Sequence, residues 1–195
     1  MSAGPLSHQP GLKNDDWAQR AVAIDWPTTT EALHQQGNAV LPQLLSATEC
    51  AALARLYGNA YESTFRSRVV MQRHGFGQGE YRYFSYPLPG VVAGLREALY
   101  PHLASIAHQW NTAMGIDVRY PTRHADFIAR CHAAGQVRPT PLLLQYGAGD
   151  SNCLHQDLYG EHVFPLQVAV LLSAVWWEQL GVMVAAACSA WITAA

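Results

Sequence analysis

The chain has 195 residues, of which half are hydrophobic and 13% are charged. This length is enough for one domain with a buried core. The net charge of −2 excludes the broad basic surface typical of strong nucleic-acid binding. The four cysteines form no Cys-x-x-Cys pair, which disfavours a disulfide framework and favours a cytoplasmic protein with reduced thiols.

The first part of the chain contains two clear helix signals. Gly37 is well placed to end a helix. Ser46 and Glu49 have the spacing of a capping box, which predicts that a helix starts behind Ser46. The elements expected in this part are a flexible arm over residues 1–28, a short helix over 30–36, a strand over 38–45 that is interrupted by Pro42, and the capped helix.

The middle of the chain alternates between strand-like and helix-like patterns. Apolar residues at helical spacing predict a long helix over residues 91–114. Helices before strands favour an α+β fold. The elements expected here are strands over residues 66–71 and 80–86 around a glycine-rich turn, the long helix, a helix over 123–132, a strand over 139–146, a turn over 147–152, and strands over 153–158 and 163–173.

Residues 174–195 form an atypical apolar tail. No Lys or Arg follows Arg138, and residues 180–195 are rich in alanine. A helix of that length would reach about 24 Å, which is short of a hydrocarbon core of about 30 Å. A membrane anchor is therefore disfavoured, and we interpret the tail as a truncated or frame-shifted end.

A His-x-Asp pair, His155 and Asp157, is the main candidate for a functional site. Side chains at i and i+2 of a strand point to the same face, so the two could bind one metal ion. With a distant histidine they would complete the 2-His-1-carboxylate triad of non-haem iron oxygenases. The alternative is a hydrogen-bonded pair in a sheet. A second pair, His124 and Asp126, lies in a predicted helix, where its members point apart, so a solvated helix face is expected there.

The residues around His155 resemble a known enzyme superfamily. Tyr146-x-x-Gly149 followed by His155-Gln156-Asp157 is similar to a block of the 2-oxoglutarate/Fe(II)-dependent dioxygenases of the AlkB and prolyl-hydroxylase types. The strings GEYRYFSYPLP, CHAAGQVRPTPLLLQY and NCLHQDLYGEHVFPLQ resemble a bacterial oxygenase family predicted to act on damaged nucleic acid. The resemblance implies a partial oxygenase domain over residues 29–173, with N-terminal helices packed on a partial double-stranded β-helix (jelly-roll) sheet.

The resemblance also implies roles for individual residues. His155 and Asp157 would bind Fe(II), and no catalytic residue beyond the metal ligands is predicted. Tyr146 and Asn152 are the candidate residues for binding 2-oxoglutarate, although a core tyrosine is an equal alternative for Tyr146. The expected chemistry is O2-dependent hydroxylation or oxidative demethylation, with alkylated nucleic acid as the expected partner.

The chain departs from the family pattern after Asp157. The only later histidine, His162, is too close to be the third ligand, and the basic residue that would pair with 2-oxoglutarate is missing. We therefore expect impaired activity. The alternatives are a prolyl or small-molecule hydroxylase and a catalytically dead binding module. Residues 66–86 combine arginines with aromatic residues, which fits either single-stranded nucleic acid or a β-ribbon with one aromatic face and one solvated face.

Overall fold

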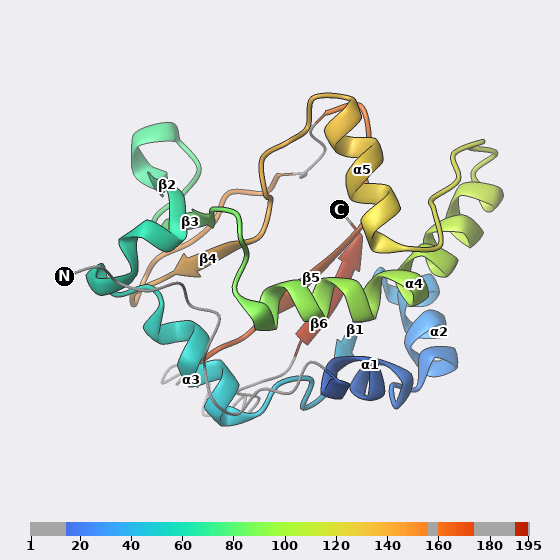
Figure 1. The fold of residues 1–195 in the computed structure, drawn as a ribbon, viewed down its shortest axis with the longest axis horizontal. Coiled ribbons are helices and arrows are strands. Elements are labelled where there is room, and N and C mark those ends of the chain that lie inside the picture. The colour runs from blue at the N-terminus through green and yellow to red at the C-terminus, as the bar shows by residue number, and fades with distance from the viewer. Residues whose placement is uncertain (1–14, 156–159, 174–189, 195) are drawn as a thin grey trace.

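The computed structural model describes residues 15–155, 160–173 and 190–194, which form helices and two small antiparallel sheets (Figure 1). The helices are α1 (Asp15–Val22), α2 (Trp26–Gln36), α3 (Ala47–Arg55), α4 (Gly90–Ala113) and α5 (His124–Ala133), with 3-10 turns η1 (Asn59–Thr64) and η2 (Met71–His74). The strands are β1 (Asn38–Leu41), β2 (Phe65–Val70), β3 (Glu80–Phe84), β4 (Leu142–Gln145), β5 (Leu166–Val170) and β6 (Ala190–Ala194). The mixed helix and sheet class is confirmed, whereas the double-stranded β-helix remains a prediction.

Local capping signals set the ends of the N-terminal helices, as predicted. Gly37 ends α2 in the left-handed conformation with φ of 71°, and its N–H donates to Leu33 O at 3.0 Å. The capping box of α3 is complete, because Ser46 and Glu49 each bind the backbone N–H of the other. The helix α2 begins earlier than expected, where the Asp25 side chain accepts a hydrogen bond from the backbone of Thr28.

Part of the segment that was expected to be a flexible arm forms α1. Trp17 and Ala21 are 3% and 1% exposed, because α1 packs against α4. The Trp17 ring lies so close to Gly94 that a β-carbon there would come within 2.5 Å of Trp17 Cδ1. Arg20 joins α1 to α3 through a salt bridge of 2.8 Å to Glu49. Residues 1–14 of the expected arm lie outside the described residues.

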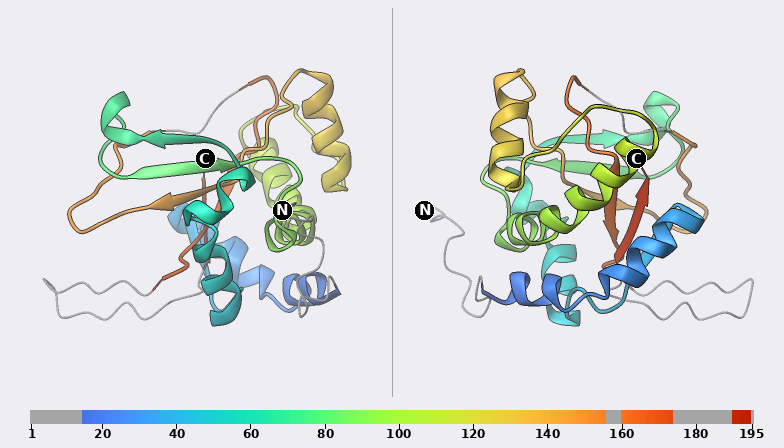
Figure 2. Two further views of the ribbon diagram at one scale, coloured as in Figure 1. Left: turned by 60° about the vertical axis from the view of Figure 1, so that its left-hand side comes forward. Right: turned by 90° about the vertical axis from the view of Figure 1, so that its right-hand side faces the viewer.

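The two sheets are separate, and their strands run nearly crosswise to one another (Figure 2). One sheet has the order β1-β6-β5 and the other the order β2-β3-β4, with every pairing antiparallel. The long helix α4 packs its apolar residues against both. One core cluster contains Leu41 of β1, Leu103 of α4 and Leu166 of β5. A second contains Leu53, Phe84 and Leu143, with Leu95 of α4 packed against it.

The C-terminal part of the chain corrects two expectations. Residues 190–194, interpreted as part of an atypical tail, form the central strand β6 between β1 and β5. Residues 153–155, expected to begin a strand, are not in a strand, and residues 156–158 of that predicted strand lie outside the described residues. The predicted strand over 163–173 is present but shorter, as β5. Among the described residues, no helix has the length and apolar character needed to cross a membrane.

Candidate functional site

Tyr146 follows β4 directly, and its ring packs against Gly79, the residue before the neighbouring strand β3. The register pairs Glu80 with Gln145, which places Tyr146 beside Gly79. A β-carbon on Gly79 would lie 2.7 Å from Tyr146 Cδ1, so the ring occupies the space of a side chain. Tyr146 is 44% exposed, which argues against the core-tyrosine alternative. Burial of part of the ring, and then the negative charge of Asp150, raise the pKa of the Tyr146 hydroxyl, so it stays a proton donor at neutral pH.

The turn predicted over residues 147–152 is present, and its own aspartate closes it. Asp150 Oδ2 accepts a hydrogen bond of 2.7 Å from Gly147 N, and Asp150 N donates to Gly147 O at 3.2 Å. Gly149 supplies a left-handed position with φ of 83°. These bonds fix the direction in which the chain leaves β4 towards His155.

A second glycine-rich loop, between β2 and β3, docks on this turn. Gln78 N donates to Ser151 O at 2.6 Å, and Cys153 N donates to Phe76 O at 2.9 Å. Between them, Gly77 and Asn152 form an isolated β-bridge. A β-carbon on Gly77 would lie 2.1 Å from Ser151 O, so this approach requires glycine. Asn152, predicted to bind the cofactor, is therefore a backbone partner of this loop. The sequence signal for this contact was the glycine-rich string HGFGQG at residues 74–79.

His155 lies just beyond the docked loops and is exposed. Its Nδ1 is 2.7 Å from Cys153 O. Where Nδ1 carries the proton, this contact leaves Nε2 as the nitrogen with a lone pair, an arrangement common among metal-binding histidines. Its predicted partner Asp157 lies outside the described residues, so the pairing stays a prediction. Within the part of the chain that the structure describes, no three His, Cys, Asp or Glu side chains are grouped as a metal site.

The chain is anchored again from residue 160 onward. The Gln136 side chain accepts from His162 N at 2.8 Å and donates to His162 O at 3.2 Å. The Gly160 backbone lies close to the same side chain, since a β-carbon there would be 2.3 Å from Gln136 Nε2. His162 is therefore held through its backbone, and both flanks of residues 156–159 have fixed positions.

The second His-x-Asp pair lies on α5, and its members have separate partners. Asp126 forms a salt bridge of 2.6 Å with Arg123. The His124 ring packs against Tyr100 at a centroid distance of 5.3 Å. Burial, and then the positive charge of Arg96, lower the pKa of His124 to about 4. The expectation of a solvated helix face holds for Asp126 and is wrong for His124.

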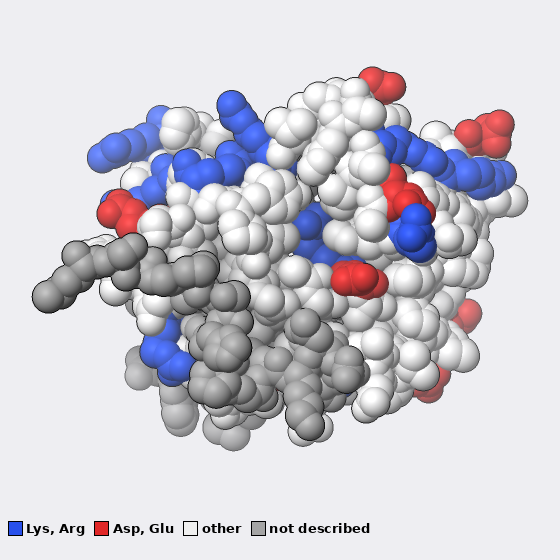
Figure 3. Space-filling model, in the orientation of Figure 1, with Lys and Arg blue, Asp and Glu red and all other residues white. Residues whose placement is uncertain are grey.

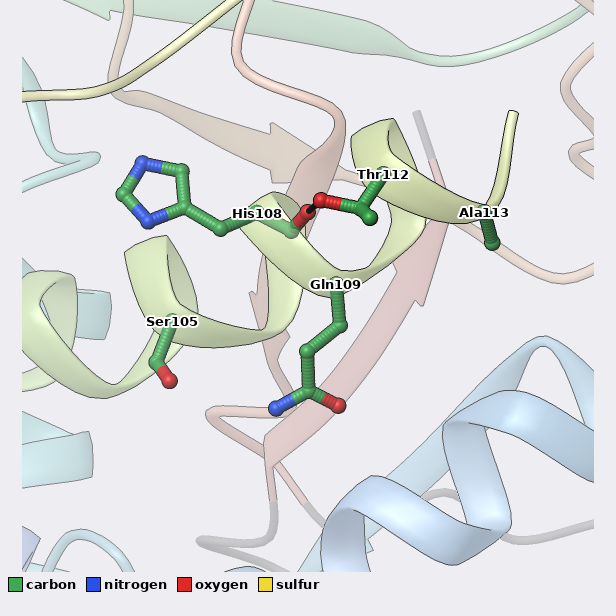
Figure 4. Close-up of a pocket in the computed structure, with 5 residues that line it drawn as sticks. All are labelled: Ser105, His108, Gln109, Thr112 and Ala113. Atoms are coloured by element: carbon green, nitrogen blue, oxygen red, sulfur yellow. Dashed lines mark hydrogen bonds between the residues drawn. The ribbon is translucent and has the colours of Figure 1, made fainter. Parts of the chain in front are cut away.

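A shallow hollow of about 520 Å³ lies on α4 (Figure 4). Neither Tyr146 nor His155 lines it. Its lining residues all come from the second half of that helix: Ser105, His108, Gln109, Thr112 and Ala113. His108 Nε2 accepts a hydrogen bond of 2.8 Å from Tyr120 N, and the Thr112 hydroxyl donates to His108 O. The His108 ring and the Thr112 hydroxyl are thus already hydrogen-bonded within the fold.

Basic side chains are spread over the upper half of the face in Figure 3, with acidic ones between them. In the β2–β3 region the arginines differ in their partners. Arg68 pairs with Glu80, and Arg82 is 8% exposed with its guanidinium 4.5 Å from the Tyr57 ring centroid. Arg66 instead lies 4.2 Å from the Tyr83 ring centroid. Each of these three arginines thus has a partner within the fold.

Comparison with known proteins identifies the family. Residues 79–181 match the profile of the Oxygenase-NA family, described as an oxygenase catalysing oxidative methylation of damaged DNA. The chain belongs to this family. The Oxygenase-NA match begins at Gly79 and contains Tyr146, the turn after it and His155, whereas the docking residues of the β2–β3 loop lie just before it.

Two curated relatives match this chain over more residues than the family profile does. They are uncharacterized proteins of Mycobacterium tuberculosis, from strain CDC 1551 / Oshkosh and from strain H37Rv. Each is 39% identical over 154 residues, which is 79% of this chain and 60% of the relative. The chain thus spans well under two thirds of the length of the curated relatives it matches. No solved structure matches the chain.

Proposed function

We propose that this member of the Oxygenase-NA family is an Fe(II)- and 2-oxoglutarate-dependent dioxygenase domain that acts on damaged DNA bases. The observation that supports this most directly is the position of His155. It lies at the end of a loop fixed by two glycine-rich segments, inside the family match, with Nδ1 against a backbone carbonyl. That contact is suited to a histidine that binds metal through Nε2.

Each candidate residue has a role in this proposal. His155 and Asp157 would bind the iron, and the Tyr146 hydroxyl would donate a hydrogen bond to a carboxylate of 2-oxoglutarate. Asn152 would position the loop through its bridge to Gly77. When bound, iron and 2-oxoglutarate would supply O2 activation and hydroxylation of a substrate C–H bond.

The protein's own contribution would be to position these groups before the cofactor binds. The loop after β4 is anchored by backbone hydrogen bonds at Ser151 and Cys153, and by Gln136 at His162. Side chains on a fixed backbone lose less entropy when they bind a ligand. The fold at large would be a partial double-stranded β-helix, in which the β2-β3-β4 sheet carries the site.

We further propose that this chain alone has low turnover. His162 is the only histidine after Asp157, and its backbone is held by Gln136. No Lys or Arg follows Arg138 to pair with the distant carboxylate of 2-oxoglutarate. The same two facts favour the second candidate function, a binding module of this fold without catalysis.

The test is metal binding and succinate formation by the purified chain. Anaerobic titration with Fe(II) is compared between the wild type, His155→Ala and the matched control His162→Ala. We expect His155→Ala to weaken iron binding at least ten-fold with no change in thermal unfolding, because the side chain is exposed. The His162→Ala variant is expected to bind iron like the wild type.

Succinate formation from 2-oxoglutarate, with a methylated oligonucleotide present, measures turnover in the same proteins. Wild-type iron binding by His155→Ala would contradict the proposed site. Iron binding without any succinate would support the binding module over the enzyme.

A further inference from the structure

The β2-β3-β4 sheet has two chemically different faces. Alternate residues of a strand point to opposite sides, and Arg82 and Phe84 of β3 are buried towards the helices. Tyr81 and Tyr83 therefore point the other way. The register adds their cross-strand neighbours, and Arg66 joins them at the register shift of β2. The residues of this tyrosine face are Arg66, Ser67, Val69, Tyr81, Tyr83, Leu142 and Leu144.

The aromatic groups of the tyrosine face are held in a fixed arrangement. The rings of Tyr81 and Tyr83 meet edge to face, with centroids 5.4 Å apart and planes at 89°. The Arg66 guanidinium lies over Tyr83, and its Nε donates to Pro139 O at 3.3 Å. Leu144 adds an apolar surface that is 49% exposed. A planar cation over an aromatic ring beside an apolar surface is suited to stacking with nucleobases.

The charges of the sheet are also separated between its faces. Glu80 lies on the same side as Arg82, where it accepts hydrogen bonds from Tyr57 and Arg68. The tyrosine face carries the positive charge of Arg66, and its seven residues include no carboxylate. An anionic chain would therefore meet a cation and no acid group on this face. A single cation suits a short segment and agrees with the modest net charge of the protein.

The tyrosine face leads directly to the candidate site. Tyr146 is the first residue after β4 and comes two positions after Leu144. Its ring lies against Gly79, the residue before β3. A nucleic-acid strand lying across Tyr83 and Tyr81 would thus point towards the loop that ends at His155.

We propose that the tyrosine face binds an unpaired segment of DNA, with bases stacked on Tyr81 and Tyr83 and a phosphate at Arg66. This inference rests on the proposed function, because it gives the route by which a damaged base would reach the site. Paired bases in a duplex have their faces covered by their neighbours, so the same contacts select for unpaired strands.

The test is fluorescence anisotropy with a labelled oligonucleotide of about 12 nucleotides, alone and annealed to its complement, matched to the few contacts on this face. No iron or 2-oxoglutarate is added, so binding is measured independently of turnover. We expect the full chain to bind the single strand at least ten-fold more tightly than the duplex. Tyr83→Leu should weaken binding about five-fold or more, whereas Tyr83→Phe should bind like the wild type because it keeps the ring.

Two further variants test the charge and the face. Arg66→Gln should reduce the slope of log affinity against log salt by about 0.7, the value for one phosphate on a single strand. The matched control is Arg55→Gln, which removes an exposed arginine of α3 and should leave the slope unchanged. Leu144→Glu places a carboxylate at an exposed position of the face and should weaken binding even if Tyr83→Leu proves unable to fold.

Several outcomes would overturn the inference. These are equal or tighter binding of the duplex, no binding of either DNA, and wild-type affinity in folded Tyr83→Leu and Leu144→Glu. A dimer in size-exclusion chromatography that Leu144→Glu converts to a monomer would instead assign the face to contact between two copies. Single-strand binding without iron binding or succinate would leave the inference standing and remove the proposed enzyme.

Discussion

The Tyr146 ring occupies the space into which a side chain on Gly79 would project. A β-carbon on Gly79 would come within 2.7 Å of Tyr146 Cδ1, and the backbone of Gly79 has φ of +115°. Both the ring contact and the positive φ exclude other residues at this position. The glycine thus joins the entry of β3 to the candidate cofactor-binding tyrosine.

Gly79→Ala should therefore destabilise the protein by about 2–4 kcal/mol, through backbone strain and displacement of the Tyr146 ring. The matched control is Gly135→Ala, which has φ of +81° with no atom within 4 Å of its β-carbon. That variant should lose only the strain, about 1–2 kcal/mol. Urea unfolding measures both. Equal losses in the two variants would show that the ring contact contributes nothing.

The buried pair between Arg20 and Glu49 makes a second prediction. Burial raises the pKa of Glu49, but hydrogen bonds from Arg20 and Ser46 outweigh it and hold the pKa below its ordinary value. A carboxyl with a lowered pKa in the folded state stabilises the fold above its unfolded pKa, near 4.5, and this contribution is lost as pH falls through the folded pKa. Glu49→Gln should cost about 2–3 kcal/mol at pH 7.

The stability of Glu49→Gln should also fall less steeply below pH 4.5 than that of the wild type. Thermal unfolding between pH 7 and pH 3 measures this difference. The control Glu97→Gln, at an exposed position of α4, should follow the wild type throughout. Parallel curves for Glu49→Gln and the wild type would rule out the linkage.

His124 gives a prediction in a higher pH range. Its pKa in the folded protein is about 4, against 6.5 for the free group. The unfolded chain therefore takes up a proton between pH 6.5 and 4 while the folded chain does not, so stability falls as pH is lowered through that window. Discounted for partial exposure, the loss is about 1–2 kcal/mol.

His124→Phe keeps a ring against Tyr100 and removes the titration, so it should lose less stability than the wild type between pH 6.5 and 4. Urea unfolding at several pH values measures this. His34→Gln, at an exposed site on α2, is the control and should show the wild-type dependence. A steeper loss in His124→Phe would contradict the assignment.

Gln136 makes a prediction for the anchor beyond residue 160. Its side chain forms two hydrogen bonds with the backbone of His162. Gln136→Ala should cost about 1–2 kcal/mol and leave a backbone N–H without its partner. Hydrogen exchange at the His162 amide should speed up by more than the global stability loss requires. Gln72→Ala, at an exposed position in η2, should change neither measurement.

Local sequence signals predicted the helices well, because each signal acts within a few residues. The capping box of Ser46 and Glu49 and the left-handed Gly37 satisfy backbone groups of their own helix. The apolar spacing of α4 likewise needs only the helix itself. The turn before His155 was predicted for the same reason, because Asp150 closes it within a few residues.

Long-range pairing accounts for what the sequence did not predict. The β6 segment lies in an alanine-rich stretch, and its pairing with Asn38–Leu41 depends on residues far away in the chain. The docking of Gly77 on Asn152 is also non-local, and a strand was expected at residues 153–155, which instead form no strand. His124 was predicted to be solvated because sequence spacing gives no information about Arg96 and Tyr100 on the neighbouring helix.

The insertion of β6 between β1 and β5 has a consequence for synthesis. During translation, β1 leaves the ribosome early, but its sheet neighbour β6 emerges much later. Until residues 190–194 have emerged, β1 and β5 expose the hydrogen-bonding edges that later pair with β6. A nascent chain that stops before residue 190 would therefore carry these edges unpaired and open to association with other strands.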